Sequence, residues 1–378
     1  MLLTQEQRIK GSLLGLAWGD ILGCPVEGWR DWEIETVYGQ YEELPQEYPL
    51  EKIGQLNPKK LKRLRPLGLH SDDTQQALAL IQICLEEGCW SKEAWGSILV
   101  KGMGAGTWRG YGRNFSGAVS RLVKGNAPEH SGSASAGMGA AMRVAPLGGI
   151  FWDCPQVLAQ ATMEASLTTH ADLRAGALAY AVTYTVAALI AGDTPKKIKK
   201  ELPKAVAQVE SEWLTNHLHW TIERPTDNLV SQGIEDIFSR HWQKPEQLRS
   251  YISQGAKRHL AKGFTKAHPN QGFVLLGGLH GLAMALSHWE DPNLILTEII
   301  AQGYDTDTVA AICGGVLGAR FGVDWIPLER FQERERLVNY GEVMAKSQGN
   351  WEGQEDFLRE EARLTKQEAD FKEEGIGS

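Results

Sequence analysis

The sequence predicts an all-α protein, a compact bundle of many helices. Apolar residues recur with the period of a helix through most of the chain. No stretch alternates apolar and polar residues for long enough to predict a β-sheet. The chain has 378 residues, of which 42% are hydrophobic. This is enough material for one large hydrophobic core.

The predicted helices follow this periodicity and cover residues 5–18, 74–87, 92–101, 155–166, 172–190, 228–240, 246–260, 272–287, 294–302, 306–321, 332–346 and 355–369. Two of these helices are expected at the centre. Residues 77–85 are apolar on nearly every face. Residues 309–321 contain Gly314, Gly315 and Gly318, and each glycine costs a helix about 1 kcal/mol relative to alanine. We therefore expect another helix to pack closely against this segment.

The domain organisation is predicted to be simple, with one domain over residues 1–365. Residues 31–69 contain four prolines and many charges, which predicts a loop or small cap inserted into that domain. Its basic run at residues 59–65 is expected to be a solvated helix face, with recognition of phosphate or an acidic protein as the alternative. Residues 366–378 are charged and are expected to form a frayed tail.

Composition limits the partners and the compartment. The net charge of −8 disfavours nucleic acid binding. Five cysteines without a CxxC pattern are typical of reduced thiols, and the first residues do not resemble a signal peptide. The longest apolar run, residues 175–191, is interrupted by tyrosines and threonines, which favours a buried helix over a membrane span. We expect a cytoplasmic monomer without a nucleic acid or membrane partner.

Two acidic clusters far apart in the chain are the strongest functional signal. Residues 71–74 (Ser-Asp-Asp-Thr) and 305–308 (Asp-Thr-Asp-Thr) each open an apolar helix. A helix N-cap needs only one such side chain, although two acidic caps favoured by the helix dipole remain an alternative. Buried carboxylates are costly without partners. Brought together at one rim of the bundle, the clusters would form an oxygen-rich cage of the kind that Mg²⁺ or Mn²⁺ prefers.

Four segments, taken in order, carry a resemblance to a known family. They are residues 15–27 (GLAWGDILGCPVE), 72–74 (DDT), 137–148 (GMGAAMRVAPLG) and 305–322, which begins with the second acidic cluster. A weaker fifth segment is residues 167–170 (LTTH). In this order and spacing they resemble the motifs of the ADP-ribosylglycohydrolase family, and they span roughly residues 8–322.

The resemblance implies a dinuclear metal site that holds two Mg²⁺ or Mn²⁺ ions. The positions that match the family's ligands all carry oxygen donors here: Ser71, Asp72, Asp73, Asp305, Asp307 and Thr308. The family commonly has Thr at position 71, and Ser71 keeps the hydroxyl group.

The family's key glutamate matches Glu27. Near such a metal centre this side chain can act as general acid or base, or orient water. Taken alone, a glutamate in a turn is usually a surface residue. Asp20 is expected to cap a helix end or to support the site, and not to bind metal.

The resemblance also implies contacts with ADP-ribose. The small, flexible loop at residues 131–139 is followed by an expected helix, and this arrangement suits a pyrophosphate, although it is also compatible with an ordinary Gly/Ser loop. The expected substrate-binding residues are Ser133, Ser135, Gly137, Met138, Gly139, His170 and Tyr304.

Two of these positions depart from the family's usual pattern. Met138 replaces an Asn whose amide would contact the ribose. Tyr304 replaces a common Gly and is expected to pack on the adenine or ribose, to narrow the mouth of the site, or to serve as a core aromatic. His170 lies beside the ribose in the family, whereas a lone His is more often structural. Trp108 and Tyr111 are candidate adenine stackers, with core packing as the alternative.

These features predict a metal-dependent hydrolase. It would cleave the glycosidic bond at the anomeric carbon of the ribose and release ADP-ribose from a protein side chain or a small acceptor. Two alternatives remain open: a catalytically weak or binding-only relative that retains the fold and the metals, and a hydrolase of another ribosyl or phosphate metabolite.

Overall fold

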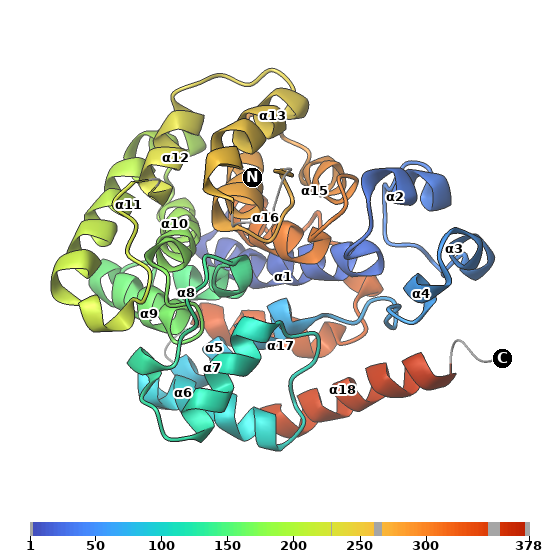
Figure 1. Cartoon of the computed structure of the whole chain (residues 1–378), viewed down its shortest axis with the longest axis horizontal. Coiled ribbons are helices and arrows are strands. Elements are labelled where there is room, and N and C mark those ends of the chain that lie inside the picture. The colour runs from blue at the N-terminus through green and yellow to red at the C-terminus, as the bar shows by residue number, and fades with distance from the viewer. Residues whose placement is uncertain (1–2, 228, 261–266, 347–355, 375–378) are drawn as a thin grey trace.

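The structure, a computed structural model, is all-α, as the sequence predicts. It describes residues 3–227, 229–260, 267–346 and 356–374. Within these ranges the chain forms eighteen α-helices and only isolated β-bridges. Figure 1 shows the helices arranged around α1 and α16, which lie side by side in the middle of the molecule.

The helices have the following bounds: α1 Gln5–Gly23, α2 Asp31–Tyr38, α3 Leu50–Leu56, α4 Pro58–Leu61, α5 Asp72–Glu87, α6 Lys92–Gly104, α7 Arg113–Val123, α8 Ala145–Ile150, α9 Pro155–Leu167, α10 Leu173–Ile190, α11 Pro195–Asn216, α12 Val230–Phe238, α13 Pro245–Ala256, α14 Leu279–Ala285, α15 Pro292–Ile300, α16 Thr306–Phe321, α17 Arg334–Lys346 and α18 Phe357–Glu374. A π-helical turn over Val274–Gly278 leads into α14. The predicted helix at residues 272–287 is therefore shorter and irregular at its start.

The contact between α1 and α16 is a direct contact between backbones. Every fourth residue of α1 from 11 to 23 is glycine. A Cβ atom on Gly19 would lie 2.0 Å from the carbonyl oxygen of Ala310, and one on Gly15 would lie 2.2 Å from that of Gly314. This confirms the close helix packing expected from the glycines of residues 309–321.

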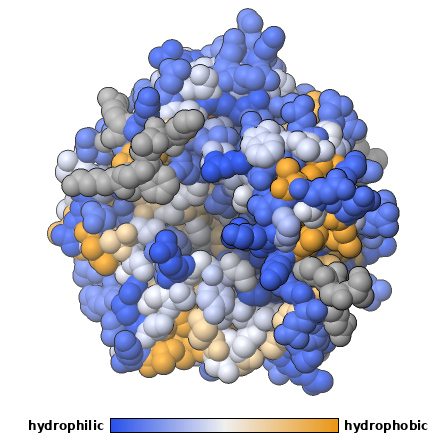
Figure 2. All heavy atoms as spheres, turned by 45° about the vertical axis from the view of Figure 1, so that its right-hand side comes forward, coloured by the Kyte–Doolittle hydropathy of each residue, from blue (hydrophilic) through white to orange (hydrophobic). Residues whose placement is uncertain are grey.

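The apolar helix α10 belongs to the core. It has the length and mean hydropathy (1.5) of a membrane span, but 89% of its residues are buried inside the protein. It packs against α8, α9, α11 and α16. On the face shown in Figure 2, hydrophilic residues dominate and hydrophobic ones gather in separate patches, as expected for a protein surface in water.

Six helices were not predicted: α2, α3, α4, α7, α8 and α11. The largest omission is α11, where Pro203 lies inside the helix and obscures its periodicity. Its buried residues Ile198, Leu202, Val206 and Val209 nevertheless follow helical spacing. The start of the predicted helix at residues 228–240 and that at residues 355–369 lie outside the described residues.

Residues 31–69 form three short helices and packed loops. The prediction of a solvated basic run at residues 59–65 is wrong for two of its cations. Lys60 is 8% exposed, pairs with Glu33 at 2.9 Å and lies over the ring of Trp29. Arg65 is 7% exposed and also points inward.

The expected frayed tail is helical as far as it is described. Helix α18 continues to Glu374, and Glu368 is 3% exposed. The prediction of fraying from residue 366 is therefore wrong for residues 366–374, because a buried side chain anchors the helix. In Figure 1, α18 runs along the lower right of the molecule.

The backbone contact of α1 with α16 predicts a large effect of a single methyl group. Gly19→Ala should lower the free energy of unfolding by about 3 kcal/mol, because the helices must separate to admit it. The matched control is Gly255→Ala in α13, where a Cβ atom meets nothing within 4 Å and alanine should be neutral or stabilise by up to about 1 kcal/mol. Urea denaturation measures both, and equal effects would contradict this view of the helix pair.

Candidate metal and substrate site

The two acidic clusters are brought together at the C-terminal end of α1. Thr306, at the start of α16, donates its hydroxyl hydrogen to the carbonyl oxygen of Gly23 at 2.8 Å. Asp20 in α1 accepts hydrogen bonds from the backbone N–H groups of Ser71 (2.9 Å) and Thr74 (3.1 Å) at the start of α5. The first turns of α5 and α16 are thus both tied to the last turns of one helix.

Asp20 supports the site as an N-terminal cap of α5, in agreement with the sequence-based expectation. Besides the two backbone donors, its carboxylate accepts the hydroxyl hydrogen of Thr74 at 2.6 Å and the thiol of Cys24 at 3.2 Å. These donors occupy both carboxylate oxygens. Asp20 therefore has little capacity left to bind a metal ion.

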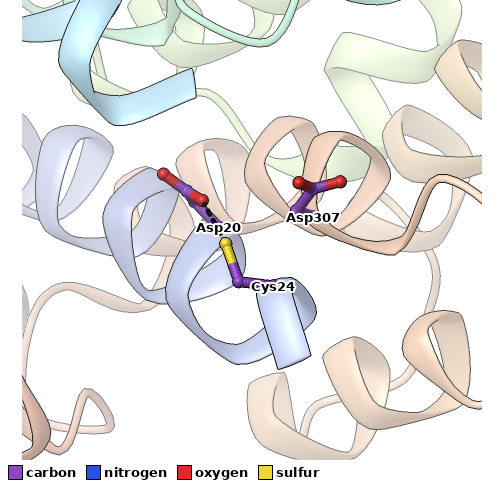
Figure 3. A group of neighbouring side chains, drawn as sticks. All are labelled: Asp20, Cys24 and Asp307. Carbon is purple, nitrogen blue, oxygen red and sulfur yellow. Dashed lines mark hydrogen bonds between the residues drawn. The ribbon is translucent and has the colours of Figure 1, made fainter. Parts of the chain in front are cut away.

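Figure 3 shows Asp20, Cys24 and Asp307 close together, with Asp20 and Cys24 joined by a hydrogen bond. Their potential ligand atoms lie within 4.8 Å of one another. Burial, followed by the charge of Asp20, raises the pKa of the Cys24 thiol well above its usual value. A protonated thiol is a poor ligand for a hard cation, so Asp307 is the member of this group that we expect to bind one.

Burial raises the pKa values of the clustered carboxylates, and Arg65 is a cation that opposes this shift at Asp72 and Asp307. Burial, with Glu27 and Asp20 adding to it, raises the pKa of Asp72 to about 7, although Arg65 opposes the shift. Burial and the charge of Glu27 raise the pKa of Asp305 to about 6. The pKa values of Asp73 and Asp307 are raised well above normal, first by burial and then by neighbouring acids.

These groups fit a hard divalent cation. Among the described residues, Asp73 Oδ1 is a buried oxygen with no hydrogen-bond partner, while Asp73 Oδ2 accepts from Ser71 Oγ at 3.0 Å. The charges of Asp73, Asp305 and Asp307 act on one another, and Thr308 lies directly beside Asp307. All these donors are oxygens, as Mg²⁺ and Mn²⁺ prefer.

Glu27 stands at the edge of this cluster. It follows a short 3₁₀ turn over Cys24–Val26 and its side chain is 48% exposed. Its charge contributes to the raised pKa values of Asp72, Asp305 and Asp307, and thus acts on residues of both clusters. An accessible carboxylate next to a metal cage can exchange protons with substrate or water.

The Gly/Ser loop at residues 131–139 packs against the segment that contains His170. Ser133 and His170 form an isolated parallel bridge, in which Ser133 N donates to Thr169 O at 3.0 Å. A Cβ atom at Gly139 would lie 2.9 Å from His170 Cε1. The fold therefore brings together the predicted substrate residues of these two motifs.

The loop differs from the expected phosphate cradle in two respects. First, a 3₁₀ turn over Met138–Ala140 takes the place of the expected helix, and α8 begins only at Ala145. Second, the hydroxyl groups bond within the protein. Ser133 Oγ accepts from Arg121 at 2.7 Å, and Ser135 Oγ accepts from Asn114 at 2.8 Å.

Met138 lies in the core. It is 2% exposed, and a Cβ atom on Gly277 would lie 2.6 Å from its sulfur atom. This position favours packing over substrate contact. An asparagine there would bury an amide in an apolar setting, which is costly without partners.

His170 is connected to the acidic cluster by a chain of hydrogen bonds. Gln76 donates to Asp72 at 3.1 Å, and Arg143 donates to Gln76 at 2.5 Å and to the Thr169 hydroxyl at 2.7 Å. Thr169 Oγ lies 2.9 Å from His170 Nδ1. Sequence reasoning missed Gln76 and Arg143, although Gln76 lies one helical turn after Asp72 and Arg143 lies inside a matched motif.

Burial and the charge of Arg143 lower the pKa of His170 to about 3, so its ring is neutral. When Thr169 donates its proton to Nδ1, the ring hydrogen is on Nε2. Nε2 lies 3.1 Å from the position of a Cβ atom on Gly139, on the side of the Gly/Ser loop. In this tautomer His170 can act as a neutral hydrogen-bond donor, whereas in the other, with Thr169 donating to the carbonyl oxygen of Ser166, Nε2 is an acceptor.

Tyr304 adopts a left-handed backbone, with φ of 66°, at the position where the related motif commonly has glycine. Its ring stacks on His268 with centroids 3.7 Å apart, and the guanidinium group of Arg30 lies 4.3 Å from the same centroid. Two groups this near one ring centre must lie on opposite faces. Adenine therefore has no free face of Tyr304 to stack on, which leaves the ring edge and hydroxyl group for substrate.

The two candidate adenine stackers pack within the protein. Trp108 is 5% exposed and packs edge-on against Phe115. Tyr111 is partly buried and lies against the same phenylalanine ring. Trp108 therefore packs in the core, which is the alternative that the sequence left open.

Comparison with known proteins identifies the family. A sequence profile for ADP-ribosylglycohydrolase matches residues 1–354. The chain belongs to the ADP-ribosylglycohydrolase family. This family acts on ADP-ribosylated substrates and generally depends on divalent metal ions, in keeping with the acidic cluster seen here.

Individual relatives of this chain are distant but align over most of their length. An uncharacterised protein from Archaeoglobus fulgidus is 26% identical, over 88% of this chain and 94% of its own. The ADP-ribosylhydrolase ARH3 of Xenopus tropicalis is 23% identical, over 87% and 91%, and that of Gallus gallus is 24% identical, over 88% and 92%. These matches support hydrolase activity in general.

A solved structure described as an ADP-ribosylglycohydrolase-related protein complex shares the fold. It aligns with a TM-score of 0.61 at 22% sequence identity, covering 92% of this chain and 100% of its own. The all-α architecture is therefore that of the ADP-ribosylglycohydrolase family.

The raised pKa values predict that metal binding depends on pH. Protons compete with the cation at Asp72 (pKa about 7) and Asp305 (pKa about 6). Affinity for Mg²⁺ should therefore rise by about 100-fold between roughly pH 5.5 and pH 7.5. Calorimetric titration of chelator-treated protein at several pH values measures this change. An affinity independent of pH would show that these two carboxylates do not bind the ion.

Because both pKa values are raised, the same groups destabilise the metal-free fold when they ionise. The folded chain binds more protons than the unfolded chain between the unfolded and folded pKa values. The contribution of these residues to stability is thus greatest near pH 4 and is lost as the pH rises toward about 7. Saturating metal should remove this trend.

Proposed function

We propose that the protein is a metal-dependent hydrolase that cleaves the glycosidic bond at the anomeric carbon of ADP-ribosylated substrates. The observation that carries this proposal is the meeting of two buried acidic clusters that include an unpartnered oxygen, Asp73 Oδ1. We assign the binding of two Mg²⁺ or Mn²⁺ ions to Ser71, Asp72, Asp73, Asp305, Asp307 and Thr308. The ions would supply the positive charge that holds and polarises the ribose hydroxyl groups.

Side chains and backbone groups of the protein would carry out proton exchange and bind the rest of the substrate. Glu27 is placed to exchange a proton with the departing group or with the attacking water, because it is half exposed and its charge acts on residues of both clusters. His170, neutral and held by Thr169, can donate from Nε2 to a ribose or phosphate oxygen. The loop at residues 131–139 would border the ADP-ribose through its backbone, since its serine hydroxyls already have protein partners.

Asp20, Gln76 and Arg143 would act indirectly. Asp20 fixes the start of α5, and Gln76 and Arg143 connect Asp72 to the His170 segment. A site that must orient a sugar between metal ligands and an acid–base group needs this kind of support, because small misplacements reduce the rate strongly.

The test of this function is a panel of substrates in which ADP-ribose is linked to arginine, to serine or to a small acyl group. Each is assayed with chelator, Mg²⁺ or Mn²⁺. We expect release of ADP-ribose from at least one substrate only when metal is present. Asp307→Asn should abolish that release and weaken metal binding measured by calorimetry. Metal binding without turnover of any substrate would favour a binding-only relative. Turnover without metal would contradict the role of the assigned metal site in the reaction.

Glu27→Gln tests the assigned acid–base residue. Glutamine has nearly the same shape but cannot transfer a proton in the same way, so turnover should fall by about 10²–10⁴-fold. Affinity for ADP-ribose should change little, and affinity for metal should fall by no more than about tenfold, because one negative charge near the ligands is lost. Steady-state kinetics measures the turnover, and parallel binding measurements give the affinities for ADP-ribose and metal. A variant within a few-fold of the wild-type rate would remove Glu27 from the mechanism.

A further inference from the structure

Helix α18 lies beyond residues 1–354, the segment shared with the family profile, yet it reaches the candidate site. It carries two buried carboxylates, Glu361 (0% exposed) and Glu368 (3% exposed). Their spacing of seven residues places both on the same face of the helix. That face is directed at the residues around the first acidic cluster.

Glu361 fixes the segment that leads into this cluster. It accepts hydrogen bonds from Arg109 at 2.7 Å and from Gln75 at 2.8 Å, and lies 3.2 Å from His70 Nε2. It also pairs with Arg336. His70 and Gln75 flank residues 71–74 in the sequence, so Glu361 fixes the residues on both sides of the first acidic cluster.

Glu368, which also accepts a hydrogen bond from Lys372, pairs with Arg65, the last cation of the basic run. The two side chains are 3.4 Å apart and are 4% and 9% exposed. Another nitrogen atom of the guanidinium group, Arg65 Nη2, lies 3.9 Å from the Glu27 carboxylate. A Cβ atom on Gly110 would lie 2.6 Å from Arg65 Nη2 and 2.9 Å from Asp72 Oδ1, so Arg65 also borders Asp72.

This arrangement is difficult to explain by stability alone. Removing two charges from water costs about as much as their attraction returns, and a well-packed apolar pair is often at least as stable. A guanidinium group whose Nε is held by a buried carboxylate is, however, well suited to orient a second carboxylate through another of its nitrogen atoms.

We propose that Arg65 is a positioning residue for Glu27 and that α18 is part of the working site, because Glu368 holds Arg65 in place. The expected effect of Arg65 on kcat rests on the proposed function. The expected effect on metal binding does not depend on turnover, because Arg65 is a fixed positive charge beside an assigned ligand.

The test uses four variants of the full chain: Arg65→Met, Arg65→Lys, Glu368→Gln and the double variant of Arg65→Met with Glu368→Gln. For Arg65→Met we expect kcat to fall by roughly tenfold to 100-fold with a smaller change in KM, because Glu27 loses its orientation while its chemistry remains. Arg65→Lys should recover part of this loss, since it keeps the charge but not the planar fork.

Metal affinity distinguishes a positioning role of Arg65 from a general loss of structure at the site. Removing a nearby positive charge should strengthen binding of Mg²⁺ or Mn²⁺ to Arg65→Met by a factor on the order of five, as measured by calorimetry. A variant whose site had merely lost its structure would bind metal more weakly. Weaker binding together with a lower melting temperature would therefore overturn the proposal, as would an unchanged kcat in an enzyme that is active as wild type.

The double variant tests whether Glu368 acts through Arg65. Glu368→Gln alone should lower kcat, as Arg65→Met does, but by less, and it should weaken metal binding, because an Arg65 without its counter-charge remains beside Asp72. In the Arg65→Met background it should have no further effect. Additive effects would show that Glu368 acts independently of Arg65.

The matched control is Glu210→Gln. Glu210 is likewise buried on a helix, in α11, and accepts from the backbone of Val230 at 2.8 Å and from Ser231. It should leave kcat and metal affinity unchanged. Should wild type turn over no substrate, the proposed function fails, while the metal affinities of the same variants still decide whether Glu368 holds Arg65 at the site.

Discussion

The backbone contact between α1 and α16 is the constraint on which the candidate site depends. Glycines at every fourth position of α1 allow α16 to approach until backbone atoms touch. At the end of this contact, a Cβ atom on Gly23 would lie 2.6 Å from the Cα atom of Asp307. The position of an acidic cluster is thus set by main-chain packing, which is much stiffer than a contact between long side chains. Asp20, on the same helix, sets the position of the other cluster by capping α5.

The site concentrates negative charge where little water can reach it, and this has two consequences. The metal-free protein holds protons on acids that would normally be ionised near neutral pH. It also contains a cation of its own, Arg65, which opposes the raised pKa of Asp72. Glu27 differs from the acids around it because its side chain is half exposed. Burial therefore separates carboxylates suited to hold an ion from one suited to exchange protons with a substrate.

The sequence predicted the fold class and the meeting of the two clusters, because helical periodicity and ordered motifs are local signals. It predicted the tight packing at Gly314 and Gly318 for the same reason. The cap helices and α11 were missed, since proline and clustered charge mask their apolar stripes. Arg65 was read as solvated because nothing near it in the sequence indicates Glu368, which lies about 300 positions away and in a helix beyond the shared motifs. Likewise, stacking of Tyr304 on the adenine or ribose was one of the roles that the sequence left open, and only the fold shows that His268 and Arg30 cover the faces of its ring.

The position of α18 affects how this protein should be divided into fragments. The segment matched by the family profile ends at residue 354, so a fragment cut at that boundary would contain every assigned metal ligand and Glu27. It would nevertheless leave His70, Arg109 and Arg336 without the buried carboxylate of Glu361. The packed structure of this chain therefore extends past the end of the segment that matches the family profile, and a fragment cut at residue 354 would lack buried contacts of that structure.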